Sequence, residues 1–134
     1  MIFVDAGAWF ALVDEADAHH HESERFFRLR MRKHAIPSVT TEYVLVETLT
    51  LLRMRLGVGA VRRFLTYLEG AKRLDVVWIT QDRYTSGLRV MLRHQDKRWS
   101  FTDCVSLALM WDLGLEDAFT FDHNFTQAGF RIHP

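Results

Sequence analysis

Short apolar runs alternate with longer helical segments along the chain, and this alternation limits the possible folds more than any other feature. The apolar runs are residues 2–4, 36–39, 76–79, 119–121 and, less regularly, 130–132. Runs of this length suit buried strands, whereas the segments between most of them have the spacing of apolar residues that is typical of helices. Strands separated by helices predict a parallel sheet with helices on both faces. The expected fold class is therefore α/β.

The boundaries of several helices can be predicted from capping residues. Thr40 or Thr41 is expected to cap a helix that Gly57 closes, and Gly114 is expected to end another. The expected helices are residues 8–14, a basic segment after His21, and residues 42–56, 58–68, 81–94 and 101–113. The 134 residues suit one domain that buries roughly two-thirds of the surface of its unfolded chain.

Four carboxylates stand beside or inside these apolar segments, namely Asp5, Glu47, Asp103 and Asp122. Asp5 and Asp122 follow expected strands, and a parallel sheet places such residues in the crevice beyond its carboxyl edge. The helix that contains Asp103 leads into the fourth strand, so that its first turn lies at the same edge. Clustered carboxylates without a neighbouring Lys or Arg favour a divalent cation. Such a cation polarises phosphoryl oxygens and activates water, which indicates phosphate chemistry.

Each carboxylate also has a purely structural interpretation. Asp5 and Asp122 stand where helix N-caps are expected, and Asp103 lies three residues after Ser100 in a capping-box pattern. Glu47 projects from a largely apolar helix face, where an unpaired charge is costly. It requires either an Arg or Tyr partner or a functional role beside a cation, and the sequence leaves both open.

Four segments, in their order along the chain, resemble the motifs of PIN-domain nucleases. They are IFVDAGAWFAL, TEYVLVETLTLL, SFTDCVSLALM and FTFDHNFTQAGF. The match is most similar to the VapC-type toxins of bacterial toxin–antitoxin pairs and covers essentially the whole chain. The resemblance implies a three-layer α/β/α sandwich with a five-stranded parallel sheet, formed by a single nuclease domain over residues 1–134.

The resemblance also implies an activity and a site. Proteins of this kind are endoribonucleases that use Mg²⁺ or Mn²⁺ and a metal-activated water, leaving a 5′-phosphate and a 3′-hydroxyl. By position, Asp5, Asp103 and Asp122 become direct or water-mediated metal ligands, and Glu47 completes the acidic pocket. The implied partners are the RNA substrate, a second copy of the chain in a homodimer, and an antitoxin whose tail enters the acidic groove.

The chain departs from the family pattern at two places. Many relatives have Thr or Ser directly after the first Asp, whereas Ala6 and Gly7 follow it here, so that a supporting hydroxyl is missing. Asn124 stands where an acid is common, and it is expected either to orient water or a metal or to cap the following helix. Thr102 is likewise either a cap or a supporting hydroxyl next to the third acid of the set.

The charges cancel, with 17 basic and 17 acidic residues, so RNA contact has to rest on local patches. One candidate patch follows the second motif and comprises Arg53, Arg55, Arg62 and Arg63. A second basic run comprises Arg25, Arg28, Arg30, Arg32 and Lys33. The second run is interpreted first as the solvated face of an amphipathic helix, and alternatively as a surface that contacts phosphate or a partner.

Several other sites are disfavoured. The single Cys104 excludes an intramolecular disulfide and is expected to be buried. His19, His20 and His21 point about 100° apart on a regular helix and cannot share one zinc or nickel ion, so they are interpreted as solvated loop residues. Trp9 is expected in the core. No membrane span or leader is apparent, and the expected location is the cytoplasm.

Two rival functions remain at this level. A non-catalytic PIN-like module would bind RNA or a protein with the same fold, and the presence of all four acids argues against it. A phosphoacceptor signalling domain also has an acidic metal pocket, but it requires an acceptor Asp at the end of the middle strand and a Lys at the end of the last strand. Neither residue is found.

Overall fold

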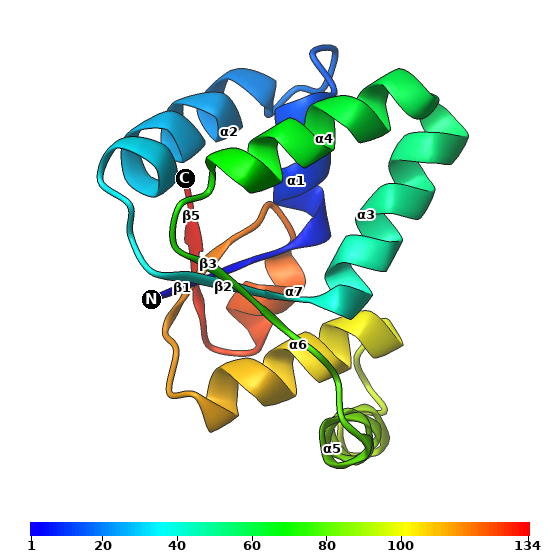
Figure 1. The fold of residues 1–134 in the computed structure, drawn as a ribbon. Coiled ribbons are helices and arrows are strands. Elements are labelled where there is room, and N and C mark those ends of the chain that lie inside the picture. Colours follow the sequence, from blue (N-terminus) through cyan, green and yellow to red (C-terminus); the bar gives the residue numbers. More distant parts are fainter.

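A computed structural model describes residues 1–134 and contains one five-stranded sheet between two layers of helices (Figure 1). The strands are β1 (Ile2–Val4), β2 (Ser38–Thr41), β3 (Leu74–Val77), β4 (Asp117–Phe119) and β5 (Arg131–His133). Every pair of neighbouring strands is parallel, and their order is β3-β2-β1-β4-β5. The expected parallel α/β fold is confirmed. The strand order reverses between β1 and β4, which is where parallel sheets of this type bind ligands.

The helices form two groups, one on each face of the sheet (Figure 1). The first group comprises α1 (Ala6–Val13), α2 (His20–Phe26), the π-helix η1 (Phe27–Lys33), α3 (Glu42–Arg55) and α4 (Val58–Gly70). The second group comprises α5 (Gln81–Arg93) and α6 (Phe101–Asp112), and the short helix α7 (His123–Gln127) follows β4. No helix has both the length and the apolar character that crossing a membrane requires.

The predicted helix caps are largely confirmed. Thr41 accepts a hydrogen bond from the backbone N–H of Val44, so the second of the two candidate threonines caps α3. Gly57 and Gly114 follow the ends of α3 and α6 with φ of 90° and 63°, a backbone region that side chains with a Cβ rarely adopt. The hydroxyl of Ser100 caps α6, as the capping-box pattern predicts.

The predicted strands are displaced in several places. β2 covers Ser38–Thr41 instead of residues 36–39. β3 begins at Leu74 and ends at Val77, two residues before the expected end, and β4 ends at Phe119 instead of residue 121. After β4, Phe121 packs against the core without belonging to the sheet, whereas after β3 the indole of Trp78 is exposed. Apolar character alone does not separate such residues from strand residues. The residue that follows β3 directly, Trp78, is therefore outside the sheet.

The histidine prediction is also partly wrong. His20 and His21 begin α2 instead of lying in a loop, and His20 Nδ1 lies 2.9 Å from the carbonyl oxygen of Ala11. The ring of His19 stacks on Phe121 with centroids 4.1 Å apart. These contacts attach the start of α2 to α1 and to the segment after β4.

The core lies between the sheet and both helical layers. The indole of Trp9 is fully buried and packs edge to face against Phe64 and Phe27, with ring centroids 5.6 and 6.4 Å apart. The side chain of Cys104 is also buried. Both placements confirm the expectations from the sequence. Such aromatic packing contributes about 0.5–1.5 kcal/mol per pair beyond the burial of area.

Gly87 is required where α5 crosses α6. A Cβ at this position would lie 2.5 Å from Val105 Cγ2 and 3.3 Å from Phe101 Cε2. Gly87→Ala is therefore expected to lower the free energy of unfolding by about 1–3 kcal/mol through overpacking. As a matched control, Gly59→Ala in α4 meets nothing closer than 3.8 Å and should stabilise by up to about 1 kcal/mol. Urea unfolding measures both, and equal effects would contradict the packing argument.

Candidate functional site

The predicted carboxylates come from four elements around the point where the strand order reverses. Asp5 follows β1 and occupies the N-cap position of α1, and Asp122 occupies the N-cap position of α7 shortly after β4. Asp103 is in the first turn of α6, and Glu47 lies in the middle of α3. Because β1 and β4 are neighbours, two of the carboxylates lie at the carboxyl edge of adjacent strands, as predicted.

Asp5 is the most deeply buried carboxylate of the set, with 6% of its surface exposed. The hydroxyl of Thr120 donates to Asp5 Oδ2 at 2.9 Å, and no Lys, Arg or His forms an ion pair with it. Burial raises the pKa of Asp5 to about 7, although the hydrogen bonds from Thr120 and the Ala6 amide lower it in part. The side chain makes no N-cap hydrogen bond, so capping does not explain its presence.

Asp103 combines a structural contact with a place in the acidic group. Its Oδ2 accepts hydrogen bonds from the Ser100 N–H at 3.0 Å and from the Asn124 amide at 3.4 Å. Burial raises its pKa and the charge of Asp122 raises it further, whereas the hydrogen bonds to Ser100 and Asn124 lower it. The capping box predicted here is present. One carboxylate oxygen thus serves both the cap and the contact with Asn124.

Glu47 has no partner that would explain it structurally. The side chain is half-buried, and none of the hydrogen bonds and ion pairs of the structure involves its carboxylate. Burial raises its pKa first, and the charges of Asp103 and Asp122 then raise it further. The sequence left two interpretations of Glu47 open, a structural partner or a functional role. The structure contains no Arg or Tyr partner for its carboxylate.

Asn124 links two of the acids. Its amide Nδ2 donates to Asp122 Oδ2 at 3.2 Å and to Asp103 Oδ2 at 3.4 Å, while its backbone N–H donates to Asp122 Oδ1 at 2.8 Å. An acid at this position would add a further charge to the group, whereas the amide offers two donors. The capping interpretation of Asp122 is also borne out, because its side chain caps α7.

The four carboxylates repel one another and lack a counter-charge. The charges of Asp103 and Glu47 both raise the pKa of Asp5, and the charge of Asp122 raises the pKa of both Asp103 and Glu47. As they are oriented, no three His, Cys, Asp or Glu side chains stand close enough to share a metal ion. Hydrogen bonds from the Ser100 N–H and the Asn124 amide hold the Asp103 carboxylate in its present orientation. Their hard oxygen ligands are those that Mg²⁺ and Mn²⁺ prefer.

The other predicted residues lie outside this group. Thr102 makes no side-chain hydrogen bond, so neither role suggested for it is seen. The arginines predicted to contact RNA are exposed on α3 and α4, and none of them forms an ion pair. Arg55 lies over the ring of Phe10, with its Cζ 5.6 Å from the ring centroid. Three of these four guanidinium groups therefore have no partner in the structure.

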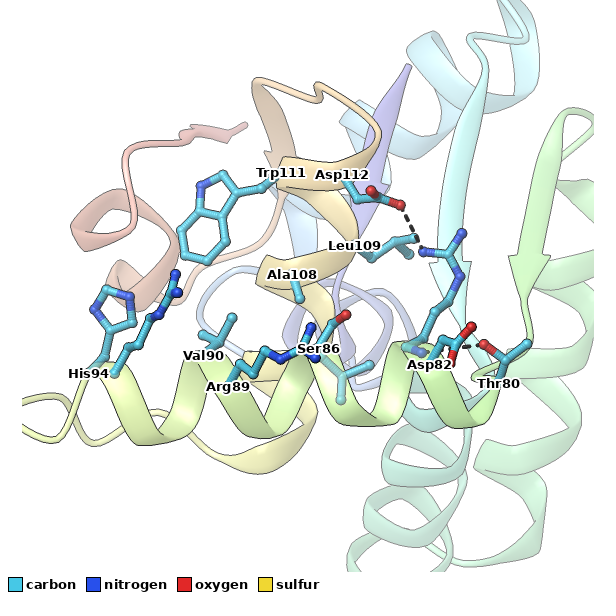
Figure 2. A pocket seen from close by; sticks show the side chains of 13 residues that line it. Thr80, Asp82, Ser86, Arg89, Val90, His94, Ala108, Leu109, Trp111 and Asp112 are labelled. Carbon is cyan, nitrogen blue, oxygen red and sulfur yellow. Dashed lines mark hydrogen bonds and ion pairs between the residues drawn. The ribbon is translucent and has the colours of Figure 1, made fainter.

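A large hollow of the surface is separate from the acidic group. It lies between α5 and α6, has a volume of about 830 Å³, and has His94 and Trp111 at one end and Asp112 at the other (Figure 2). None of the four carboxylates lines it. At ~100° per residue, Ala108 and Asp112 point to the side of α6 opposite Asp103. The acidic group and this hollow are therefore lined by different residues.

The sequence did not point to Thr120, although it supplies a hydroxyl to Asp5 from the neighbouring strand. Its hydroxyl also accepts a hydrogen bond from the Asp122 N–H at 3.0 Å, and only 1% of the residue is exposed. It thus occupies the role that the absent Thr or Ser after Asp5 would have filled. The sequence feature that could have indicated this role is the polar residue between Phe119 and Phe121.

Replacing Thr120 by Val should loosen Asp5 without changing the size of the side chain. We expect a loss of about 10- to 100-fold in Mn²⁺ affinity if Asp5 is the predicted ligand, because Thr120 holds one of its carboxylate oxygens. Isothermal titration calorimetry measures this, with Thr126→Val on the exposed face of α7 as the control. Thr120→Ser should restore most of the affinity, and unchanged binding in Thr120→Val would show that the hydroxyl has no such role.

Comparisons with known proteins give a consistent result. A family model described as PIN domain matches residues 2–131. The chain is 35% identical over 133 residues to the 23S rRNA-specific endonuclease VapC20 of Mycobacterium tuberculosis, in both strain CDC 1551 and strain H37Rv, covering 97% of this chain and 95% of the relative. The crystal structure of M. tuberculosis VapC20, described as a sarcin–ricin loop cleaving toxin, superimposes with a TM-score of 0.87 at 30% identity and covers 100% of both chains.

Proposed function

The chain belongs to the PIN-domain family, and from this premise we propose that it is a metal-dependent endoribonuclease that acts as the toxin of a toxin–antitoxin pair. The observation that carries the proposal is the group of four carboxylates without a cationic partner at the switch point of the sheet. Acids that raise one another's pKa and meet no Lys or Arg are costly to maintain unless a divalent cation joins them.

The residues of the site have distinct roles in this proposal. Asp5, Asp103, Asp122 and Glu47 would hold Mg²⁺ or Mn²⁺ directly or through water. When bound, the cation supplies a Lewis acid and lowers the pKa of a water molecule. Thr120 orients the carboxylate of Asp5 through the hydrogen bond to Oδ2.

Substrate binding needs basic residues outside the acidic group, because four carboxylates repel phosphate. The exposed arginines Arg53, Arg55, Arg62 and Arg63 are suited to this role. VapC20 is named for 23S rRNA and for cleavage of the sarcin–ricin loop. We infer that this chain also cuts a structured RNA with an exposed loop, and that the sarcin–ricin loop is the first candidate.

The family premise also extends to partners. We infer that the chain forms a homodimer and that a cognate antitoxin inhibits it by placing a basic segment against the acidic group. Residues 1–134 would act as one nuclease domain in the cytoplasm, where ribosomal RNA is available. An Arg of the antitoxin would meet carboxylates that have no cationic partner within the chain itself.

The test is cleavage of a synthetic sarcin–ricin hairpin and of total cellular RNA by purified protein that is free of antitoxin. Discrete products are expected with Mg²⁺ or Mn²⁺ and none with EDTA, while circular dichroism confirms that the fold is intact in both. Cleavage that persists in EDTA would overturn the metal dependence. The absence of products from a folded protein that binds metal would instead favour a non-catalytic module that binds RNA or protein.

A further inference from the structure

Trp78 is the most exposed tryptophan of the chain, with 73% of its surface accessible. Trp9 and Trp99 are buried, and Trp111 is 42% exposed beside the hollow between α5 and α6. An indole has a large apolar face and is usually buried, so an indole that is exposed to water is available to bind another molecule. The position of Trp78, rather than its exposure alone, indicates a role.

The register of the sheet places Trp78 at the same edge as Asp5. Phe3 pairs with Val39, and Thr41 pairs with Val77, so continuing the first register by two residues puts Asp5 level with Thr41 and Val77. Trp78 follows Val77 directly. Strands β1 and β3 are separated by β2 only, which corresponds to about 10 Å across the sheet. The backbone of Trp78 therefore lies at the same edge of the sheet as the proposed active site, two strands away from Asp5.

The backbone around Trp78 is held in place by α3. Glu42 Oε1 accepts a hydrogen bond of 2.5 Å from the Ile79 N–H, and Thr80 caps α5 through the Arg83 N–H. The second carboxylate oxygen, Glu42 Oε2, is buried without a partner. The residue after Trp78 is thus hydrogen-bonded to α3, the helix that carries Glu47.

A row of aromatic rings connects the acidic group with the same region. Tyr43 lies one helical turn before Glu47, and its ring centroid is 6.1 Å from that of Phe101. Phe101 in turn packs edge to face against Tyr84 of α5 at 5.0 Å, and 43% of Tyr84 is exposed. This aromatic row begins beside the carboxylates and extends to the helix that starts just after Trp78.

We propose that Trp78 is a stacking platform for an unpaired base of the RNA substrate, near the phosphate that is cut. The inference rests on the proposed ribonuclease function and adds a contact outside the acidic group. A separation of about 10 Å corresponds to about three nucleotides of a stacked strand. Aromatic rings bind bases of any sequence through their π-faces, and one such contact changes affinity by about 5- to 150-fold.

The chain segment that follows Trp78 suits a base better than a protein partner. Three polar residues that follow Trp78 in the chain are exposed, namely Thr80, Gln81 and Asp82. The core of a protein interface is apolar and depleted in charge, whereas a single ring among polar groups suits a flat base. The test below also measures association between copies of the chain, so that a protein contact is detected if it exists.

The kinetic test compares variants in steady-state cleavage of the sarcin–ricin hairpin with Mg²⁺. Trp78→Leu keeps an apolar side chain but removes the π-face, so KM should rise about tenfold with little change in kcat. Trp78→Phe should recover most of the loss. Trp111→Leu removes an exposed indole that lines the hollow between α5 and α6, which none of the four carboxylates lines, and its KM should equal that of the parent protein. An unchanged KM in Trp78→Leu would overturn the proposal.

A second measurement does not depend on cleavage. In EDTA, octa-adenylate should quench indole fluorescence of the parent protein and of Trp111→Leu but not of Trp78→Leu, and an abasic ribose-phosphate octamer should quench none. Base-dependent quenching without any RNA cleavage would keep the platform and refute the proposed nuclease function. Equal quenching by both oligomers would overturn the platform. The platform would also be overturned if Trp78→Leu had a normal KM but a molar mass in light scattering that differed from that of the parent protein. The ring would then join copies of the chain.

Discussion

Asp5→Asn is expected to reduce the cleavage rate of the sarcin–ricin hairpin by at least about a thousandfold. The substitution keeps the shape of the side chain and its hydrogen bond to Thr120 but removes a charge from the group proposed to hold Mg²⁺. Loss of the Lewis acid removes several kcal/mol of transition-state stabilisation, and each ~1.4 kcal/mol corresponds to a factor of ten. Single-turnover cleavage with saturating enzyme measures the effect on the chemical step.

The matched control is Asp75→Asn, which removes a carboxylate from the exposed side of β3. It should cut the hairpin at the rate of the parent protein. Calorimetry should show that Asp5→Asn binds Mn²⁺ more weakly while its circular dichroism spectrum is unchanged. If Asp5→Asn retained full activity, the buried carboxylate would have no part in the reaction, and the acidic group would need another explanation.

The stability of the metal-free protein should fall as pH rises, by up to about 4 kcal/mol from Asp5 alone. Burial raises the pKa of this carboxyl from 3.8 to about 7, so between these values the folded protein binds more protons than the unfolded chain. The free energy of unfolding therefore decreases with pH across this window and levels off above it. About three pKa units correspond to about 4 kcal/mol, and the raised pKa of Asp103 and Glu47 acts in the same direction.

Urea unfolding in EDTA at about pH 5 and about pH 8 measures this dependence. Asp5→Asn should remove most of it and should be more stable than the parent protein at the higher pH. Added Mg²⁺ should stabilise the parent protein more at pH 8 than at pH 5. At pH 8 the carboxylates are charged, whereas at pH 5 the ion has to compete with protons for them. A parent protein that becomes more stable from pH 5 to pH 8 in EDTA would contradict the pKa assigned to Asp5.

Asp117 provides an internal contrast at the other end of the sheet. Hydrogen bonds from Arg131 and His133 lower its pKa to about 2, so its stabilising effect is present above pH 3.8 and is lost as pH falls towards 2. This window lies below that of Asp5. Asp5 and Asp117 therefore change the free energy of unfolding in different pH ranges, and one pH titration of stability separates their effects.

Much of the architecture followed from local patterns. The apolar run at residues 2–4 and the helices that begin at Gln81 and Phe101 were placed correctly, because caps and apolar spacing act over a few residues. The ends of β3 and β4 were displaced by two residues. The seven-residue π-helix was not predicted at all, since a change in the hydrogen-bond pattern from i+4 to i+5 leaves the apolar spacing of the sequence nearly unchanged.

The sequence by itself determined the fold class, the family and the four acids, because strand–helix alternation, motif order and residue type are local properties. Only the tertiary structure decided what surrounds each acid: the Thr120 hydroxyl on Asp5, the Asn124 amide between Asp103 and Asp122, and the lack of any partner for Glu47. These contacts join residues up to 115 positions apart. Burial and charge act through space, so the raised pKa of Asp5 and the placement of Trp78 at the same edge of the sheet depend on the order and register of the strands.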